Sequence, residues 1–207
     1  MQFNDHAPWM LGLALATGMA HSTAASATIG QTAPAFSVTD AQGKAVSLAD
    51  FKGKTVVLEW VNPECPYVRK HYDSANMQAS QKAATGKGVV WLSVNSTHPS
   101  HNDHKKPAEM LAWTQQQGAA PSATLMDGEG KLGRSYGART TPHMYVIDAK
   151  GTLVYAGGID DKASANPADV KTAKNHVNAA LADVLAGKPV AQPVTRAYGC
   201  SVKYGDS

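Results

Sequence analysis

The chain contains two cysteines, and the first of them has the sequence context of a reactive thiol. Cys65 follows an apolar run, residues 55–61, that predicts a strand buried on both faces. It precedes Pro66, a residue that suits the first position of a helix. We therefore expect Cys65 to be the N-cap, where unpaired backbone N–H groups and the helix dipole favour a thiolate over a thiol. The alternative is a buried, inert cysteine.

Charged residues close to this cysteine are expected to modulate it. Arg69 and Lys70 come one helical turn later and would add positive potential at the sulfur. Glu64, directly before the cysteine, would oppose them.

The second cysteine does not complete a Cys-x-x-Cys motif, because the required position is Val68. Cys200 lies near the C-terminal end instead. A mixed disulfide on Cys65 would then be resolved either by Cys200, moving in on a mobile tail, or by an external thiol. A third interpretation is a permanent Cys65–Cys200 bond, which in the chain-entropy model would stabilise the fold by roughly 4–5 kcal/mol.

Hydrophobic periodicity and turn residues predict a single domain in which strands and helices alternate. The expected strands are an N-terminal hairpin over 36–48, core strands at 55–61, 89–94 and 123–126, and a second hairpin over 144–155. The expected helices are residues 66–86, 107–117, 130–136 and 166–187, the last with Asn166 as its N-cap. This order indicates an α/β sandwich whose sheet has a parallel part and antiparallel edges.

The N-terminal segment, residues 1–27, is predicted to be a signal peptide. Its apolar run, residues 10–16, is too short to span a bilayer, and Ala25-Ser26-Ala27 is an Ala-x-Ala cleavage pattern, although no Lys or Arg precedes the run. We therefore expect a periplasmic or secreted protein, the alternative being a disordered N-terminal tail. The domain would then span 28–187, with 188–207 as a C-terminal tail.

Composition narrows the classes of partner. The chain has 207 residues, 43% of them hydrophobic and 17% charged, with a net charge of +3. Lys and Arg are spread out, which argues against a nucleic-acid partner. No later segment is long and apolar enough for stable membrane insertion.

Several longer motifs resemble one family. Cys-Pro at a helix start and Thr140-Thr141-Pro142 before a strand look like the thioredoxin superfamily. Residues 29–60 and 125–157 resemble the redoxin or alkyl hydroperoxide reductase/thiol-specific antioxidant group, and "NPECPYVRKHY" with "YGCSVKY" resembles its peroxiredoxin-like branch. The resemblance implies a thioredoxin-like three-layer sandwich, a central mixed sheet with helices on both faces and an N-terminal hairpin. It also implies a cis Pro142 that faces Cys65.

The chain departs from the peroxiredoxin motif Pro-x-x-x-Thr/Ser-x-x-Cys. Asn62 occupies the Thr/Ser position and Leu58 the proline position. An amide on Asn62 would still donate to a peroxide oxygen, and Arg139 is a candidate replacement for the family's arginine, which would fall near Pro142.

These considerations give a set of candidate site residues. The expected catalytic set is Cys65, Cys200, Pro142, Asn62 and Thr141, and the expected substrate-site lining is Pro66, Tyr67, Arg139 and His143.

A histidine-rich stretch is the remaining candidate for chemistry. His98, His101 and His104, with Asp103, are weak candidates for a zinc or copper site. Their spacing matches no established metal motif, so we favour a solvated loop and expect no metal and no bound cofactor.

The expected reaction is thiolate attack by Cys65 on a peroxide, or on a protein or small-molecule disulfide. Cys200 would then attack Cys65, leaving a disulfide for an external thiol reductant to open. The rival interpretation is a non-catalytic thioredoxin-fold protein that binds a metal or a partner and carries a structural Cys65–Cys200 disulfide.

Overall fold

The structure is a computed structural model that describes residues 1–2 and 27–205. A five-stranded sheet in the order β5-β4-β3-β7-β8 runs through the centre of the domain. The strands are β3 (Val56–Trp60), β4 (Val90–Asn95), β5 (Ala123–Met126), β7 (His143–Ile147) and β8 (Leu153–Gly157). The first three are parallel, and β7 and β8 are antiparallel to their neighbours, so the predicted mixed sheet is confirmed.

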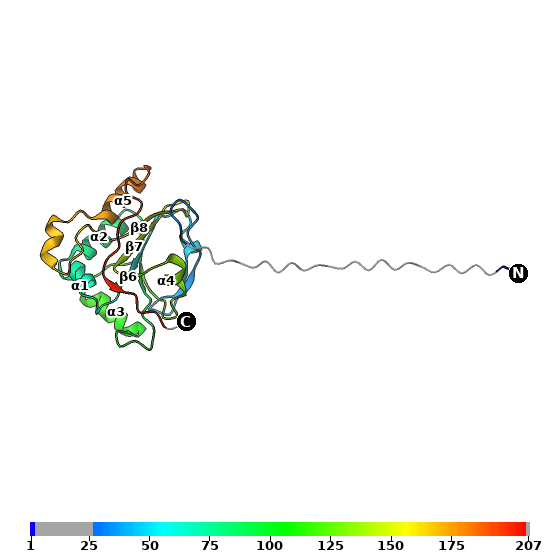
Figure 1. The fold of residues 1–207 in the computed structure, drawn as a ribbon, viewed down its shortest axis with the longest axis horizontal. Helices are drawn as coiled ribbons and strands as arrows, with labels where there is room; N and C mark the ends of the chain where they lie inside the picture. The colour runs from blue at the N-terminus through cyan, green and yellow to red at the C-terminus, as the bar shows by residue number, and fades with distance from the viewer. Residues whose placement is uncertain (3–26, 206–207) are drawn as a thin grey trace.

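Elements cover both faces of this sheet, which completes the predicted three-layer sandwich (Figure 1). One face carries the helices α1 (Pro66–Asp73), α2 (Asn76–Thr85), α3 (Pro107–Gln116) and α5 (His176–Leu185). The other face carries α4 (Lys131–Tyr136) and the N-terminal hairpin of β1 (Ser37–Thr39) and β2 (Ala45–Ser47), which is followed by a 3₁₀ turn, Leu48–Phe51. Because both faces of the sheet are covered, every residue of β3 and β4 is buried.

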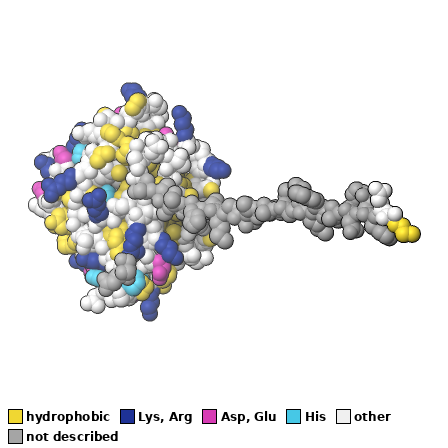
Figure 2. All heavy atoms as spheres, turned by 45° about the vertical axis from the view of Figure 1, so that its right-hand side comes forward, with side chains coloured by type: hydrophobic (Ala, Val, Ile, Leu, Met, Phe, Trp, Pro, Cys, Tyr) yellow, Lys and Arg dark blue, Asp and Glu magenta, His cyan; other side chains and the backbone are white. Residues whose placement is uncertain are grey.

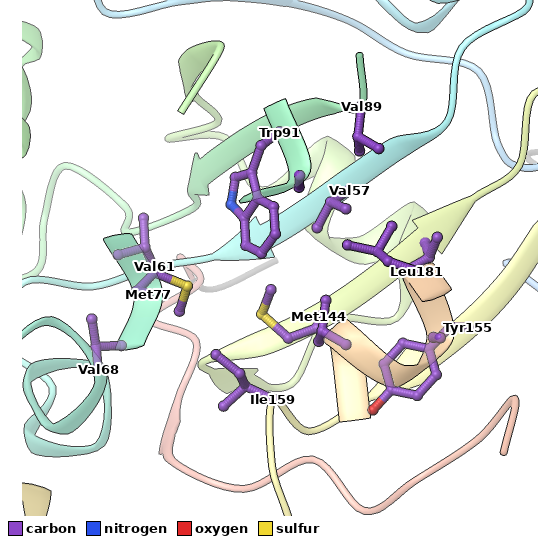
Figure 3. Close-up of a cluster of buried hydrophobic side chains, with 14 of the residues drawn as sticks. Val57, Val61, Val68, Met77, Val89, Trp91, Met144, Tyr155, Ile159 and Leu181 are labelled. Carbon is purple, nitrogen blue, oxygen red and sulfur yellow. The ribbon is translucent and has the colours of Figure 1, made fainter. Parts of the chain in front are cut away.

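Alternation along the strands supplies both halves of the core. Val57 and Met144 point into the cluster under the four helices, whereas Leu58 and Tyr145 point into the cluster under α4 and the hairpin. Figure 3 shows the first cluster, where Val68, Met77 and Leu181 from three different helices meet side chains of the sheet. Cys65 belongs to the same cluster.

The single helix predicted for 66–86 is wrong, because the chain breaks at Ala75. That residue has a left-handed backbone, φ 58°, and separates α1 from α2. The break rotates the second helix, so its buried side chains include Met77, Gln81 and Ala84, while Ala79 and Ala83 are exposed.

The predicted last helix is also divided. Asn166 caps as expected, but only a 3₁₀ helix follows, Pro167–Thr172. Ala173 is extended, since the adjoining segment forms a bridge between Asp160 and Asn175. Asn175 then accepts from the backbone N–H of Asn178 and caps α5.

Backbone hydrogen bonds tie the C-terminal segment to the domain from Pro193 to Val202. Pro193 accepts a backbone hydrogen bond from Ala156 on the edge strand β8. Further on, β9 (Cys200–Ser201) pairs with β6 (Thr140–Thr141), as Figure 1 shows. The expectation of a mobile tail is therefore corrected: backbone pairing holds residues 193–202 in place.

The predicted signal peptide lies almost wholly outside the described residues. Within the described part, no helix combines the length and the apolar character needed to cross a membrane. On the face seen in Figure 2, Lys and Arg side chains are dispersed and do not form one stripe.

Candidate active site at Cys65 and Cys200

Cys65 lies at the joint between β3 and α1, as the sequence predicts. Its backbone is extended, φ −76° and ψ 121°, and Pro66 takes the first helical position, so Cys65 is the N-cap. The preceding loop is closed by Asn62, whose side-chain Oδ1 accepts from Glu64 N at 2.9 Å and whose carbonyl accepts from Cys65 N at 3.0 Å. The residue is 1% exposed.

The sulfur of Cys65 has different neighbours from those expected. It makes no hydrogen bond to the N–H groups of the first helical turn. Its Sγ lies 3.0 Å from the carbonyl oxygen of Thr141 and 2.8 Å from the Sγ of Cys200. The reason is that β6 and β9 lie across the start of α1 and place both groups over the sulfur.

The Thr141–Pro142 peptide bond is cis, in agreement with the family resemblance. Thr141 is directly opposite Cys200 in the antiparallel β6–β9 pair. The chain reaches this position through Gly199, φ 135°, where an added Cβ would lie 2.0 Å from the Thr141 oxygen. Only glycine leaves room for the backbone to approach so closely.

Cys200 is held as a thiol by its surroundings. Burial is the largest cause, and the hydrogen bond to Cys65 and the charge of Cys65 add to it, so the pKa of Cys200 rises to about 12. The positive charge of Lys203 acts in the opposite direction. Cys200 therefore retains its proton more firmly than an ordinary cysteine.

The basic residues of α1 do not face the sulfur, which corrects the expectation of added positive potential. Arg69 donates to Glu64 at 2.6 Å on the surface, and Lys105 pairs with the same carboxylate at 2.7 Å. The hydrogen bond from Lys105 is the main cause that lowers the pKa of Glu64. Lys70 is fully buried and pairs with Asp160 at 3.1 Å.

Asn62 lies close to Cys65, but its amide is already engaged. Its Nδ2 donates to Asp103 Oδ2 at 3.0 Å, which fastens the histidine-rich loop to the cysteine loop. In that loop His98 Nδ1 bonds to Ser100 Oγ and His104 Nδ1 bonds to the Thr97 oxygen. No group of three or more potential metal ligands gathers among the described residues, and His98, His101 and His104 are not brought together into one there.

The predicted lining residues are divided between the site and its surroundings. Tyr67 is half-buried, and the centroid of its ring lies 5.9 Å from the centroid of the Tyr198 ring. Pro66 is exposed. His143 starts β7 and is buried, and desolvation, helped by the charge of Arg139, lowers its pKa to about 4. Arg139 is exposed, and its backbone N–H donates to His143 Nδ1 at 3.3 Å.

Sequence reasoning missed a buried polar cluster next to the cysteines. The cluster contains Lys70 and His71 of α1, together with Asp160 and the hydroxyl of Tyr198. Tyr198 comes two residues before Cys200. No sequence signal marks Lys70 as buried, because it lies off the helical face that Val68 and Tyr72 share. Nothing in the sequence singles out Asp160 as the partner of Lys70.

A cleft of about 460 Å³ opens beside the cysteine loop. Pro63 and Glu64 line one side, and Trp113 of α3 lines the other. Its walls are mostly polar or charged, and Cys65 is not among its lining residues.

The sheet order, the N-cap cysteine and the cis proline together define a thioredoxin-fold protein. The model of the AhpC/TSA family matches residues 29–156, which is more than half of the chain. The chain belongs to the AhpC/TSA family.

Named relatives point to thiol chemistry. The chain is 30% identical over 142 residues to the thiol:disulfide interchange protein DsbE of Yersinia pestis, covering 66% of this chain and 69% of the relative. It is 28% identical over 126 residues to the thiol-disulfide oxidoreductase ResA of Bacillus thuringiensis subsp. konkukian, covering 61% and 67%. The predicted class, a thiol-disulfide oxidoreductase or thiol peroxidase, is thereby confirmed.

Two solved structures share most of the fold. An uncharacterized conserved protein from Geobacillus kaustophilus has a TM-score of 0.73 at 26% identity, covering 87% of this chain and 94% of that protein. A hypothetical protein from Sinorhizobium meliloti 1021 also has a TM-score of 0.73, at 25% identity, covering 88% and 97%. This likeness includes more of the chain than the family match does.

Proposed function

We propose that this protein catalyses thiol-disulfide exchange, with Cys65 as the nucleophile and Cys200 as the resolving thiol. The observation that carries the proposal is the 2.8 Å separation of the two sulfurs beside the cis Thr141–Pro142 bond. A disulfide needs an S–S distance of about 2.05 Å, so a small displacement brings the sulfurs to bonding distance.

The reaction has two displacement steps. The Cys65 thiolate attacks one sulfur of a substrate disulfide, which releases the first substrate thiolate and leaves a mixed disulfide on Cys65. Cys200 then loses its proton and attacks the Cys65 sulfur, releasing the second substrate thiolate. Two electrons have passed to the substrate, and Cys65 and Cys200 are oxidised to a disulfide. An external dithiol opens it by the same steps in reverse.

The pKa of Cys200 supports this order of events. The charge of Cys65 and the hydrogen bond between the sulfurs are two of the four causes that raise the pKa of Cys200. Both are lost once Cys65 is consumed in a mixed disulfide, and the pKa of Cys200 then falls toward the range of an effective attacking thiol. The resolving thiol is thus activated by the first step.

Disulfides are favoured over peroxides as substrates by the residues around Cys65. The Thr/Ser position of the peroxiredoxin motif holds Asn62, and its amide is already bonded to Asp103. The relatives named above carry thiol-disulfide names. Peroxide reduction is therefore the competing activity, and the same experiment measures it.

The test compares the wild type with Cys65→Ser and Cys200→Ser. With oxidised glutathione as substrate, Cys200→Ser should accumulate a glutathione adduct on Cys65 that mass spectrometry detects, and the wild type should resolve it. Turnover with dithiothreitol as reductant should vanish in Cys65→Ser. Hydrogen peroxide consumption is measured in parallel.

The outcomes separate the candidate functions. Faster turnover of hydrogen peroxide than of disulfides would make the protein a thiol peroxidase. Full disulfide turnover by Cys200→Ser would remove the resolving role. Absence of both activities in reduced wild-type protein would leave the non-catalytic binding protein as the remaining interpretation.

We also propose that the protein acts outside the cytoplasm, with residues 1–27 removed as a signal peptide. The support is the apolar run at 10–16 and the Ala25-Ser26-Ala27 pattern. Mass spectrometry of the mature chain from a cell-envelope fraction should find Thr28 at the N-terminus. Intact residues 1–27 on the mature protein would contradict the proposal.

A further inference from the structure

Four buried polar side chains form a closed network beside the cysteine pair. Lys70 and His71 come from α1, Asp160 from the loop after β8, and Tyr198 from the C-terminal segment. All four are at most 8% exposed. Charged groups are rarely buried to this degree unless paired, so the network requires an explanation beyond packing.

Each hydrogen-bonding group in the network has a partner. Lys70 Nζ donates to Asp160 Oδ2 at 3.1 Å, to the Lys162 oxygen at 2.6 Å and to Tyr198 Oη at 3.2 Å, which uses its three protons. Tyr198 donates its own hydroxyl proton to Asp160 Oδ1.

His71 completes the network as a neutral ring. The Asn76 amide lies 2.8 Å from His71 Nδ1 and the Tyr198 hydroxyl lies 3.1 Å from Nε2. With the amide donating to Nδ1, the ring proton is on Nε2 and is donated to the Tyr198 oxygen. The tyrosine hydroxyl therefore makes one donor and two acceptor bonds.

The position of Tyr198 connects this network to the redox pair. Tyr198 is two residues before Cys200, and Lys70 is in the first turns of the helix that begins at Cys65. Gly199, the residue between Tyr198 and Cys200, is in tight contact with the Thr141 backbone. Fixing the hydroxyl of Tyr198 therefore fixes the approach of the Cys200 sulfur to Cys65.

We infer that Tyr198 is a positioning residue that holds Cys200 against Cys65 through Lys70 and Asp160, and thereby sets the reduction potential of the pair. The inference deepens the proposed function and rests on it. An anchored Cys200 has a high effective concentration at Cys65, which favours the internal disulfide over a mixed disulfide with an outside thiol. The anchor replaces the helical turn that holds the two cysteines of a Cys-x-x-Cys motif.

The test measures the potential directly. Wild type and Tyr198→Phe are equilibrated with defined ratios of reduced and oxidised dithiothreitol, and free thiols are counted by alkylation and mass spectrometry. Tyr198→Phe keeps the ring and loses the hydroxyl, so the equilibrium constant for forming the internal disulfide should fall roughly tenfold, which raises the potential by about 30 mV. A potential equal to that of the wild type would overturn the inference.

Tyr136→Phe is the matched control. Tyr136 is also buried and donates its hydroxyl to the Pro34 oxygen at 2.8 Å, but it belongs to the core on the opposite face of the sheet. It should lose comparable stability without a change in potential. Equal shifts in both variants would show a general loss of stability and would also overturn the inference.

Two further measurements distinguish the inference from misfolding of the Tyr198→Phe variant and from failure of the proposed reaction. Asp160→Asn weakens the same network from the loop and should raise the potential as Tyr198→Phe does. In a Cys65→Ser background, Tyr198→Phe should speed alkylation of Cys200 at least several-fold, and an unchanged rate contradicts anchoring. If the potential shifts while the wild type lacks exchange activity, the anchor stands and the proposed function fails.

Discussion

Cys200 is 135 residues beyond Cys65 in the chain, and its sulfur lies 2.8 Å from that of Cys65. The proximity is produced by the two-residue pair of β6 and β9, in which Thr141 is opposite Cys200. The cysteine pair therefore depends on backbone pairing between the C-terminal segment and the cis-proline loop, and variants that disturb this pairing should separate the sulfurs.

Gly199→Ala is expected to separate the cysteines without touching either side chain. An added Cβ would meet the Thr141 oxygen at 2.0 Å, so β9 must move away from β6. We expect alkylation of Cys200 in the reduced protein to become at least tenfold faster, and formation of the internal disulfide to slow. The alkylation rate is measured by quenched mass spectrometry.

Gly187→Ala provides the control for backbone strain. Gly187 also has a positive φ, 68°, but a Cβ there would have open space around it. It should cost about 1–2 kcal/mol in stability and leave the alkylation rate of Cys200 unchanged. Equal acceleration in both alanine variants would mean that the close approach at Thr141 does not hold the segment.

Lys70→Met should strongly destabilise the fold, because it leaves Asp160 as a buried, unpaired charge. We expect a loss of about 3–5 kcal/mol in the free energy of unfolding, measured by urea denaturation. The adjacent Arg69 offers a comparison, since its side chain is 53% exposed in its pair with Glu64. Arg69→Met should cost less than about 1 kcal/mol.

The double variant Lys70→Met with Asp160→Asn checks the cause. Removing both charges should restore part of the stability lost in Lys70→Met, which gives a favourable coupling energy in a double-mutant cycle. Additive losses would indicate that packing of the lysine stem, and not its charge, carries the effect.

The sequence predicted the mixed sheet and the N-cap position of Cys65 because these follow from local patterns, whereas the three layers were implied by the family resemblance. Apolar runs identify β3 and β4, and Cys65-Pro66 marks the helix start. The break at Ala75 was not predictable in this way, because alanine is a strong helix former and its left-handed backbone is imposed by tertiary contacts.

The neighbours of the Cys65 sulfur were also beyond local reasoning. The sequence predicted that first-turn N–H groups would surround the sulfur, whereas the Thr141 oxygen and the Cys200 sulfur contact it instead. Glycine and proline residues near Cys200 suggested mobility, whereas Gly199 is present because of a close contact. Only the fold shows which of these two roles a glycine has.

Acid should weaken the fold through His71. Burial is the main cause that lowers the pKa of His71 to about 4, below its ordinary value of 6.5. The stability that the neutral ring contributes is complete above pH 6.5 and is lost as pH falls through about 4. His143 behaves alike, so the wild type should lose up to about 1.4 kcal/mol per histidine for each pH unit in this window. His71→Gln should reduce this slope in denaturation experiments, and an identical slope would contradict a neutral buried His71.

Glu59 should act with the opposite sign. This carboxyl is fully buried in β3 and accepts from Tyr72, Trp91, Gln81 and Ser93. Burial outweighs these bonds and raises the pKa of Glu59 above 4.5. Its contribution to stability is therefore complete below pH 4.5 and is lost as pH rises through the folded-state pKa.

Glu59→Gln should remove that loss, because an amide stays neutral at all pH values. The Gln oxygen can accept from Trp91 at the position of Oε2, and the amide nitrogen can donate to a rotated Tyr72 hydroxyl. We expect the variant to be as stable as the wild type, or more stable, at pH 8, and to show no advantage at pH 4. Unfolding free energies at the two pH values measure this difference. The contradicting result is a Glu59→Gln variant whose loss of stability relative to the wild type is larger at pH 8 than at pH 4. It would mean that the four hydrogen-bond donors outweigh burial and that Glu59 is held as a carboxylate.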